Sequence, residues 1–477
     1  MSHTAAQTGV AQTHHRLARS GMVLTGLSLA ILLSQLGTNI INVALPTLVT
    51  SFKTSFGAVQ WVVVSYLLTV TALIVGVGRF GDQLGKKRLY LWGLAIFMIA
   101  SIICALSSNL TLLIAGRAAQ GLGGAIIMAL SFAFVGEVFP KERMGFAMGV
   151  LSTMVSFGIA LGPSLGSLAL SIFGWQAMFW LNLPFGILAY LLVCRYLPST
   201  VDAPKHPIPA VRFDWLGTIL LAATLGAYSL AMTFSAARGF DDRLVVQLIL
   251  GAIAALALFL GVQVRTKAPL LQIAMFRNVL LSTSMAMSVL VYAVMMATLV
   301  LGPFFLSKAV GLDTRSVGLV MTIGPLAAAL MGVPAGFVAD RIGARLAMVM
   351  GLALFNIGAF VMSWVTATDG VPVYITAILL ISVGLAFFQT PNNTAVMADA
   401  RPERRGLVSG LLALARNLGL ITGASLMGAI FAHAVGDAAT ATPDAIASGM
   451  RLAFQIAAFM AAAAFLLALT TLRRRVP

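Results

Sequence analysis

The 477-residue sequence has few acidic residues and only two cysteines. It contains 14 Asp and Glu against 30 Lys and Arg, and charged residues make up 9% of the chain. A soluble globular domain usually carries about 25% charged residues, so this composition excludes that class. Cys104 and Cys194 lie in apolar runs without metal-ligand spacing, so we expect neither a disulfide nor a metal site.

Motifs for nucleotide binding and catalysis are also missing. No G-x-x-x-x-G-K-[ST] loop is present, which disfavours an ATP-driven pump. Gly76, Gly78 and Gly81 match a dinucleotide-binding pattern, but they lie inside an apolar run with no strand before them. The loops are too short for a soluble catalytic domain and hold no Ser/His/Asp set. We therefore expect a protein that is not an enzyme and has no cofactor.

Long apolar runs dominate the sequence instead, and 60% of its residues are hydrophobic. A helix that spans a membrane needs roughly 20 mostly apolar residues. Fourteen runs of about this length predict an all-α integral membrane protein with 14 transmembrane helices. The expected spans are 22–44, 57–78, 89–107, 111–134, 146–169, 175–197, 215–234, 244–263, 283–306, 317–338, 346–366, 371–391, 405–434 and 449–471.

The positive charges lie mainly on one side of these spans. A net charge of +16 is compatible with nucleic-acid binding, but with the N-terminus inside, 21 of the 30 Lys and Arg fall on that side and six on the other. This asymmetry follows the positive-inside rule. It predicts a multi-pass protein of the cytoplasmic (inner) membrane with both termini cytoplasmic, the lipid bilayer as its partner and no nucleic acid. A monomer is the working expectation.

A signature from Gly78 to Arg88 returns in reduced form from Gly336 to Arg345. Asp82 and Asp340 are 258 residues apart (340 − 82), and Glu142 and Glu403 are 261 apart (403 − 142). Similar offsets across an even number of spans predict two parallel six-helix repeats, with two extra helices inserted between them. The expected parts are a cytoplasmic tail (1–21), a first bundle (22–197), a linker (198–213), the inserted helices (214–265), a second bundle (266–471) and a cytoplasmic tail (472–477).

The repeated signature predicts a conformational lock. Asp82 lies at a helix end, where its carboxylate can meet the positive N-terminal dipole of a neighbouring helix. The alternative is an ordinary positive-inside loop, which explains the cations but neither the Asp nor the glycines. The predicted lock residues are Gly78, Asp82, Gly85, Lys87, Arg88, Asp340, Arg341 and Arg345.

Two arginines lie within the predicted spans at membrane depth. An arginine there costs roughly 2.5–3.5 kcal/mol unless it faces protein or water, so Arg117 must face inward. It is either a static anchor bonded to carbonyl groups or a residue for coupling or substrate binding. The same alternatives apply to Arg416, for which the anchor role is favoured.

These motifs together resemble the major facilitator superfamily, and within it the fourteen-helix drug/proton antiporters. The resemblance covers nearly the whole chain and implies drug export driven by a proton gradient. It includes the Gly78–Arg88 loop, Arg117 with Gln120 and Gly121, Asn42 to Pro46, Gly174 with Trp175, and the antiporter motif Gly158, Gly162, Pro163 and Gly166. The glycines of that motif leave one helix face bare, which permits close packing and sliding.

The sequence departs from the family where the coupling ion is concerned. Many relatives carry an Asp five residues before Asn42, and here that residue is Gly37. No carboxylate lies near the centre of a predicted span. Coupling therefore uses a peripheral group, with Glu137, Asp214 and His433 as candidates, or the carrier is uncoupled.

The expected substrate cavity is neutral, amide-rich and aromatic. Such a lining suits a neutral, zwitterionic or anionic amphipath, and an Asp at position 37 should improve cation export. We favour export of drugs or toxic metabolites by alternating access; the alternative is a carrier for one specific metabolite, and a membrane enzyme or sensor is disfavoured. The predicted cavity residues are Gln35, Thr38, Asn42, Trp61, Tyr66, Arg117, Gln120, Tyr292, Gln389 and Asn393.

Overall fold

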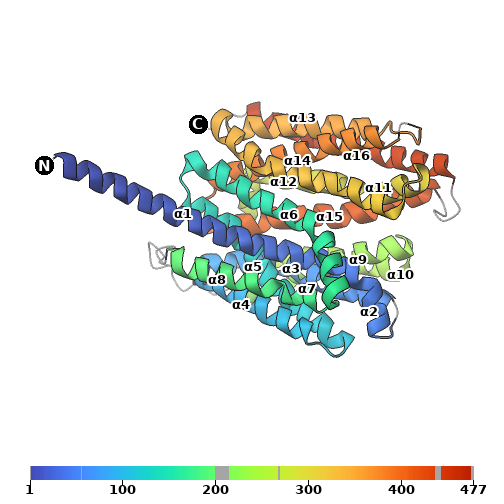
Figure 1. Ribbon diagram of the computed structural model, residues 1–477, viewed down its shortest axis with the longest axis horizontal. Coiled ribbons are helices and arrows are strands. Elements are labelled where there is room, and N and C mark those ends of the chain that lie inside the picture. Colours follow the sequence, from blue (N-terminus) through green and yellow to red (C-terminus); the bar gives the residue numbers. More distant parts are fainter. Residues whose placement is uncertain are drawn as a thin grey trace.

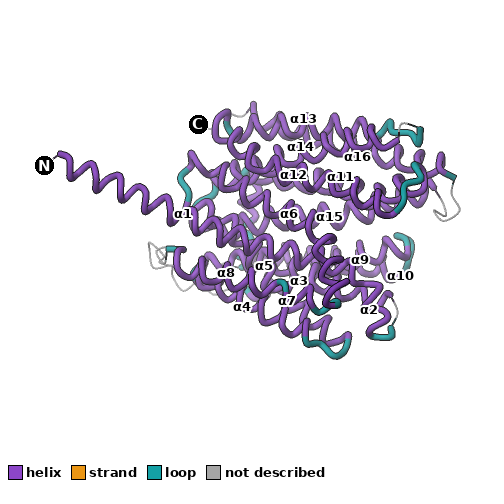
Figure 2. The backbone as a smooth tube through the Cα atoms, in the orientation of Figure 1, coloured by secondary structure: helices purple, strands orange, loops and turns teal. Residues whose placement is uncertain are grey.

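The computed structural model describes residues 2–54, 56–198, 214–266, 269–368, 370–435 and 442–473. These residues form helices joined by short turns and contain no strand (Figure 2). Among them are 14 helices long and apolar enough to cross a membrane. The predicted all-α class with 14 membrane spans is confirmed, and the apolar runs alone identified every span.

The helices fall into two bundles and an inserted pair. The N bundle contains α1 (Ser2–Asn39), η1 (Ile40–Ala44), α2 (Leu45–Ser51), α3 (Phe56–Leu84), α4 (Lys86–Ala105), α5 (Leu110–Val138), α6 (Lys141–Phe173), α7 (Ala177–Trp180) and α8 (Asn182–Tyr196). The inserted pair is α9 (Trp215–Arg238) and α10 (Arg243–Arg265). The C bundle contains η3 (Ile273–Arg277), α11 (Val279–Phe304), η4 (Phe305–Ala309), α12 (Thr314–Ile342), α13 (Ala344–Met362), α14 (Gly370–Asp399), η5 (Pro402–Arg404), α15 (Arg405–Val435) and α16 (Pro443–Arg473).

Both termini lie at the same end of the molecule, on the left in Figure 1. We call this the termini end and the other the opposite end. The two bundles pack side by side with their helices roughly parallel to the same axis (Figure 1). Chain order pairs α3 with α12, α4 with α13, α5 with α14, α6 with α15, and α8 with α16, as the two repeats predict.

Glycine forms the turn that starts the third spanning helix of each repeat. Gly85 precedes α4 with a φ of 100°, and Gly343 precedes α13 with a φ of 90°. A side chain is strained at such angles, whereas glycine adopts them readily. The glycines of the repeated signature are therefore explained locally by a tight helix-to-helix turn.

The bundles meet along two glycine seams near the termini end. In the first, α6 lies against α12, and a Cβ atom added at Gly145 or Gly336 would overlap the backbone of the other helix. The second places α3 against α15, where a Cβ atom at Gly78 would overlap the carbonyl oxygen of Gly406. Small residues let membrane helices approach to backbone contact, so these glycines allow the termini end to close.

The inserted helices cover the second seam. Helix α9 packs on both α3 and α15, and α10 packs on α9. Toward α3, Phe234 makes an edge-on ring contact with Trp61 at 6.2 Å between centroids. Toward α15, the Ser425 hydroxyl donates to the Met232 carbonyl, and the hydroxyls of Tyr228 and Thr422 hydrogen-bond. Helix α9 therefore touches both bundles at once.

Gly336→Val should open the termini end. The added side chain overlaps the backbone of α6, and overpacking of this kind costs about 1–3 kcal/mol. In a protein without native cysteines, Thr153→Cys reports on the seam, since the Thr153 hydroxyl bonds to Ala329 of the C bundle. We expect maleimide labelling at position 153 to rise by about tenfold.

Gly318→Val is the matched control for this experiment. Gly318 lies on the same helix, but a Cβ atom added there meets nothing within 4 Å. The control should label like the parent. Equal labelling of the Gly336→Val and Gly318→Val proteins would show that the seam does not hold the termini end closed.

Candidate functional site

A small cavity lies between the bundles, lined almost entirely by the C bundle. Phe132 of α5 is the residue that the N bundle contributes to its lining. Helices α11, α14 and α15 supply the rest. The lining residues are Phe132, Ser288, Tyr292, Phe388, Gln389, Asn392, Asn393, Ser409, Leu412, Ala413 and Arg416.

The polar lining residues form a partly satisfied hydrogen-bond network. The Tyr292 hydroxyl donates to Gln389 Oε1 at 2.5 Å, and Asn392 Nδ2 donates to Ser288 Oγ at 3.3 Å. Gln389 Nε2, Asn392 Oδ1 and Ser409 Oγ are buried and lack a partner. Buried polar atoms are nearly always bonded, so these three are available to a ligand.

Arg416 places a positive charge in this cavity. It lies 14 residues along the span from Pro402 (416 − 402), which is about 21 Å along the axis and near the middle of the span. Its side chain is buried, lies within hydrogen-bonding reach of Tyr292, and has Nη2 3.8 Å from Met128 Sδ of the N bundle. The sequence placed Arg416 at membrane depth but favoured an anchor role and left it out of the cavity.

The cavity is nearly closed in this conformation. The space that water can reach among the lining side chains is about 30 Å³, whereas pockets for drug-sized ligands measure roughly 300–1,000 Å³. A substrate would enter only after the bundles separate around it.

Three predicted cavity residues line this cavity, and Arg117 does not. Tyr292, Gln389 and Asn393 are in its lining. Arg117 is instead enclosed in the N bundle, where Nε donates to the Val62 carbonyl and Nη1 donates to the Gly37 carbonyl, each at 3.0 Å. Of the two roles left open for Arg117, these contacts match the anchor that ties α5 to α1 and α3.

The other predicted N-bundle residues whose side chains are described are also absent from the lining of this cavity. Gln120 Oε1 accepts from Arg117, and its Nε2 donates to Ser101 Oγ at 2.8 Å. The Tyr66 hydroxyl donates to the Ser34 carbonyl at 3.1 Å, and the Arg117 guanidinium lies 4.4 Å from the centre of its ring. Thr38 bonds to its own helix, Trp61 contacts Phe234 of α9, and Gln35 packs on α6. The side chain of Asn42 lies outside the described residues.

Position 37 does not face the cavity either. A Cβ atom added at Gly37 would lie 2.9 Å from the Phe97 ring and 3.9 Å from Gln120 Nε2, inside the N bundle. An Asp side chain at this position would start beside Phe97 and Gln120 rather than in the cavity lining, and the expected gain in cation export stays a prediction.

The antiporter motif packs α6 onto α1 rather than onto the C bundle. A Cβ atom at Gly158 would overlap Gln35, and one at Gly166 would lie 2.8 Å from the Ile40 carbonyl oxygen. Gly162 is buried, and the side chain of Pro163 lies outside the described residues. The bare face therefore sets how closely α6 approaches the point where α1 gives way to η1.

Asp340 bridges the bundles at the termini end. Its carboxylate accepts from the backbone N–H groups of Gly145 at 2.8 Å and Phe146 at 2.9 Å, in the second turn of α6. This is the kind of helix contact predicted for the two aspartates, although its locking role stays a prediction. The side chain of Asp82, for which it was first predicted, lies outside the described residues.

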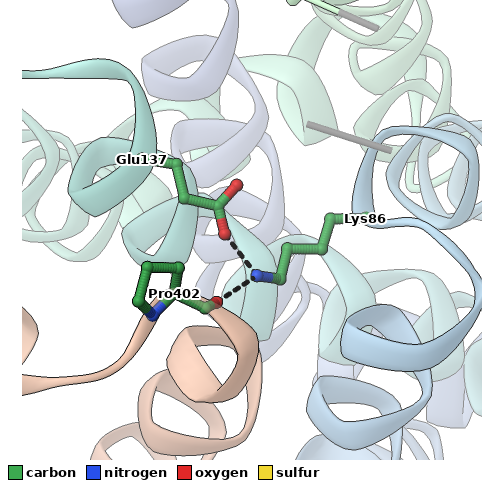
Figure 3. Close-up of polar contacts among 3 residues, drawn as sticks. All are labelled: Lys86, Glu137 and Pro402. Atoms are coloured by element: carbon green, nitrogen blue, oxygen red, sulfur yellow. Dashed lines mark hydrogen bonds and ion pairs between the residues drawn. The ribbon is translucent and has the colours of Figure 1, made fainter. Parts of the chain in front are cut away.

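Lys86 forms a second bridge at the same end. Its ammonium group pairs with the Glu137 carboxylate of α5 and donates to the Pro402 carbonyl of the C bundle at 3.0 Å (Figure 3). Arg405 of α15 is also close enough to Glu137 to interact electrostatically. The predicted lock omitted Lys86, and the acidic residue Glu137, one residue before the end of α5, was the signal that could have identified it.

The neighbouring cations of the signature have different partners. Lys87 Nζ donates to the carbonyl of Cys194 in the last turn of α8 and to the carbonyl of Leu197, which follows that helix. Arg345 Nη1 donates to the Thr471 carbonyl of α16. Such contacts satisfy the free carbonyls at helix C-termini. Arg88 and Arg341 are exposed. The contacts of Lys87 and Arg345 hold helices within a bundle, and the predicted locking role of the four cations stays a prediction.

The remaining coupling candidates differ in their surroundings. Asp214 begins α9, where its carboxylate accepts from the Gly217 N–H at 2.7 Å, from Gln263 Nε2 at 2.6 Å and from the Leu270 N–H at 3.1 Å. These bonds connect the start of α9 to α10 and to the segment that follows α10, which is a structural role. His433 is exposed near the opposite end.

Comparison with known proteins decides the family. The sequence matches the profile described as Major Facilitator Superfamily over residues 27–424 and 283–477. This chain belongs to the major facilitator superfamily. The membership identifies it as a multi-pass membrane transporter, in agreement with its fourteen spans and its two repeats.

Superfamily relatives of similar length carry different names. The riboflavin transporter RibZ of Clostridioides difficile (strain 630) is 31% identical over 417 residues, which cover 87% of this chain and 89% of that protein. The methylenomycin A resistance protein of Streptomyces coelicolor is 30% identical over 447 residues and 91% of both chains. Among solved structures, the proton:xylose symporter XylE shares the fold with a TM-score of 0.63 at 15% identity, covering 93% of this chain and 95% of that one.

Arg117→Met should destabilise the transporter. The substitution removes the hydrogen bonds from the charged guanidinium to the Val62 and Gly37 carbonyls, and a hydrogen bond made by a charged group contributes about 1.5–3 kcal/mol. We expect the purified protein to unfold several degrees below the parent in a thermal melt. Arg243→Gln, at an exposed helix start, is the control and should melt with the parent. An unchanged melt with weakened substrate binding would instead assign Arg117 to the substrate.

Proposed function

We propose that this transporter exports amphipathic drugs or toxic organic metabolites across the cytoplasmic membrane by alternating access. The observation that carries the proposal is a polar cavity at mid-membrane depth between two bundles related by repeats. Transporters built this way expose such a midplane cavity to one side at a time by rocking the bundles. The antibiotic-resistance name of the Streptomyces relative supports export.

The contacts at the termini end suggest which interactions change during transport. The two glycine seams, the Asp340 bridge and the Lys86 bridge all lie on this side. We assign this side to the cytoplasm because most Lys and Arg residues fall there. Opening toward the cytoplasm would then break these contacts, and the conformation described is the one closed on that side.

We propose a neutral, zwitterionic or anionic amphipath as the substrate. The described lining offers amide and hydroxyl groups, one arginine and apolar side chains, and it contains no carboxylate. A few placed polar groups within an apolar lining are typical of sites for small organic ligands. A lipophilic cation would find no counter-ion there.

We propose proton antiport with Glu137 as the coupling residue. Its carboxylate is largely buried and pairs with the lysine that bonds across to the C bundle. A proton on Glu137 would remove that ion pair and weaken the closure of the termini end. Opening toward the cytoplasm would then depend on protonation, as antiport requires.

Glu137→Gln should uncouple transport from the proton gradient. In everted vesicles, we expect this variant to keep substrate exchange but to lose most of the stimulation by an imposed pH gradient, because its side chain cannot titrate. Glu142→Gln is the matched control, since Glu142 is exposed in the first turn of α6. If the Glu137→Gln vesicles still respond to the gradient like the parent, another group couples transport.

A carrier for one specific metabolite is the second candidate function. A relative with 31% identity is named as a riboflavin transporter, and the amide-rich cavity also suits a neutral polar ring system. Radiolabelled riboflavin taken up by cells, or exchanged in proteoliposomes, would favour this function if competing antibiotics had no effect.

The test of export is a growth screen in a strain that lacks its own efflux pumps. Expression should raise the inhibitory concentration of several unrelated amphipaths, and everted vesicles should accumulate the same compounds. Accumulation of a single metabolite and no resistance phenotype would favour the second candidate.

A further inference from the structure

Arg416 is an uncompensated buried cation at the centre of the molecule. Its contacts are the Met128 sulfur at 3.8 Å and the Tyr292 hydroxyl. No carboxylate of the described residues forms an ion pair with it. A buried charge is stable only when it is paired and hydrogen-bonded, and neither a thioether nor a phenol offsets a full positive charge.

The contrast with Arg117 shows that this arrangement is not forced by the fold. Arg117 has two backbone carbonyls and the Gln120 amide as acceptors for its Nε and Nη1 groups, while its Nη2 is buried without a partner. Arg416 has no carbonyl oxygen among its contacts and borders the cavity instead. Of the two mid-membrane arginines, Arg117 joins helices of the N bundle, whereas Arg416 faces the cavity and can contact a ligand there.

A second hydrogen-bond donor lies in the same cavity. The bond from the Tyr292 hydroxyl occupies Gln389 Oε1, and this leaves Nε2 buried without an acceptor. Gln389 is 8% exposed, as is Arg416. Tyr292 contacts both residues, so the guanidinium and the free amide N–H belong to one network with unused donors. Unused donors beside a buried cation are suited to the oxygens of a carboxylate.

The opposite wall of the cavity is apolar. Phe132 and Met128, both on α5, approach from the N bundle, while the polar groups come from the C bundle. The Met128 sulfur is a weak acceptor on a flexible side chain, which a ligand can displace at little cost. A ligand held between the walls would have its acidic group toward α15 and its apolar body toward α5.

We propose that Arg416 binds the acidic group of the substrate, with Gln389 as a second donor, so that the transported compounds are lipophilic carboxylates. The proposal rests on the proposed function, because it takes this cavity as the substrate site. It makes Arg416 the specificity-determining residue. Acids bind, matched amides bind weakly, and matched amines are excluded.

Three compounds that share one ring system test this assignment. They are 2-naphthoate, 2-naphthamide and 2-naphthylmethylammonium, and their binding to the purified full-length protein is measured by calorimetry. The naphthoate should bind at least about tenfold more tightly than the amide, and the amine should not bind. Equal binding of acid and amide, or no binding of the acid, would overturn the proposal.

Variants assign the preference to Arg416. Arg416→Gln should lower naphthoate affinity by about tenfold or more while leaving naphthamide unchanged, and Arg416→Lys should restore part of the loss. Arg451→Gln, on α16 and outside the cavity lining, is the control and should bind like the parent. If Arg416→Gln does not fold, Gln389→Leu replaces it and should weaken naphthoate binding selectively. Undiminished naphthoate binding in these variants would contradict the assignment.

Transport measurements separate this proposal from the proposed function. Proteoliposomes loaded with naphthoate are assayed for exchange with external labelled naphthoate. Arg416-dependent binding without exchange would leave the acid site standing and refute transport through this cavity. Exchange of naphthoate that is unaffected by Arg416→Gln would support transport and overturn the acid site.

Discussion

Contact between the two bundles depends on how closely helix backbones can approach. Lipid tails are as apolar as leucine side chains, so membrane helices gain little from burying apolar surface against each other. At the termini end the two bundles meet through glycines, with Gly145 against Gly336 and Gly78 against Gly406. Backbone packing of this kind is strong only at very short range. It therefore favours two discrete arrangements of the bundles, closed or apart.

The two repeats use the same geometry with different chemistry. Lys87 and Arg345 are 258 residues apart (345 − 87), and each binds the carbonyl end of the last helix of its bundle. The residue before each differs: Lys86 bridges to the C bundle, whereas its counterpart is Ala344. One seam thus carries a titratable ion pair, and the other carries the Asp340 contact to backbone N–H groups. The two repeats thus keep the same helix geometry while their polar bridges differ in chemistry.

The sequence predicted membrane spans and repeats well, because both depend on patterns along the chain. It could not predict which way a side chain points on a helix that is apolar all round, since such a helix has no polar face to orient it. Arg117 and Arg416 illustrate the limit. Both were assigned to membrane depth, but only neighbouring helices decide that Arg117 meets backbone carbonyls and Arg416 meets the cavity. Lys86 and Lys87 are adjacent, and the rotation of about 100° between successive residues of a helix directs them to different partners.

The inserted helix α9 makes unlike contacts with its two neighbours. It is hydrogen-bonded to α15 through Ser425 and Thr422, but it meets α3 through aromatic rings, Phe234 on Trp61 and Trp215 on Phe80. Hydrogen bonds in lipid fix a partner in place, whereas ring contacts tolerate displacement. If the bundles move relative to each other, α9 would thus move with the C bundle and slide along α3. It would keep the α3–α15 flank covered as it moves.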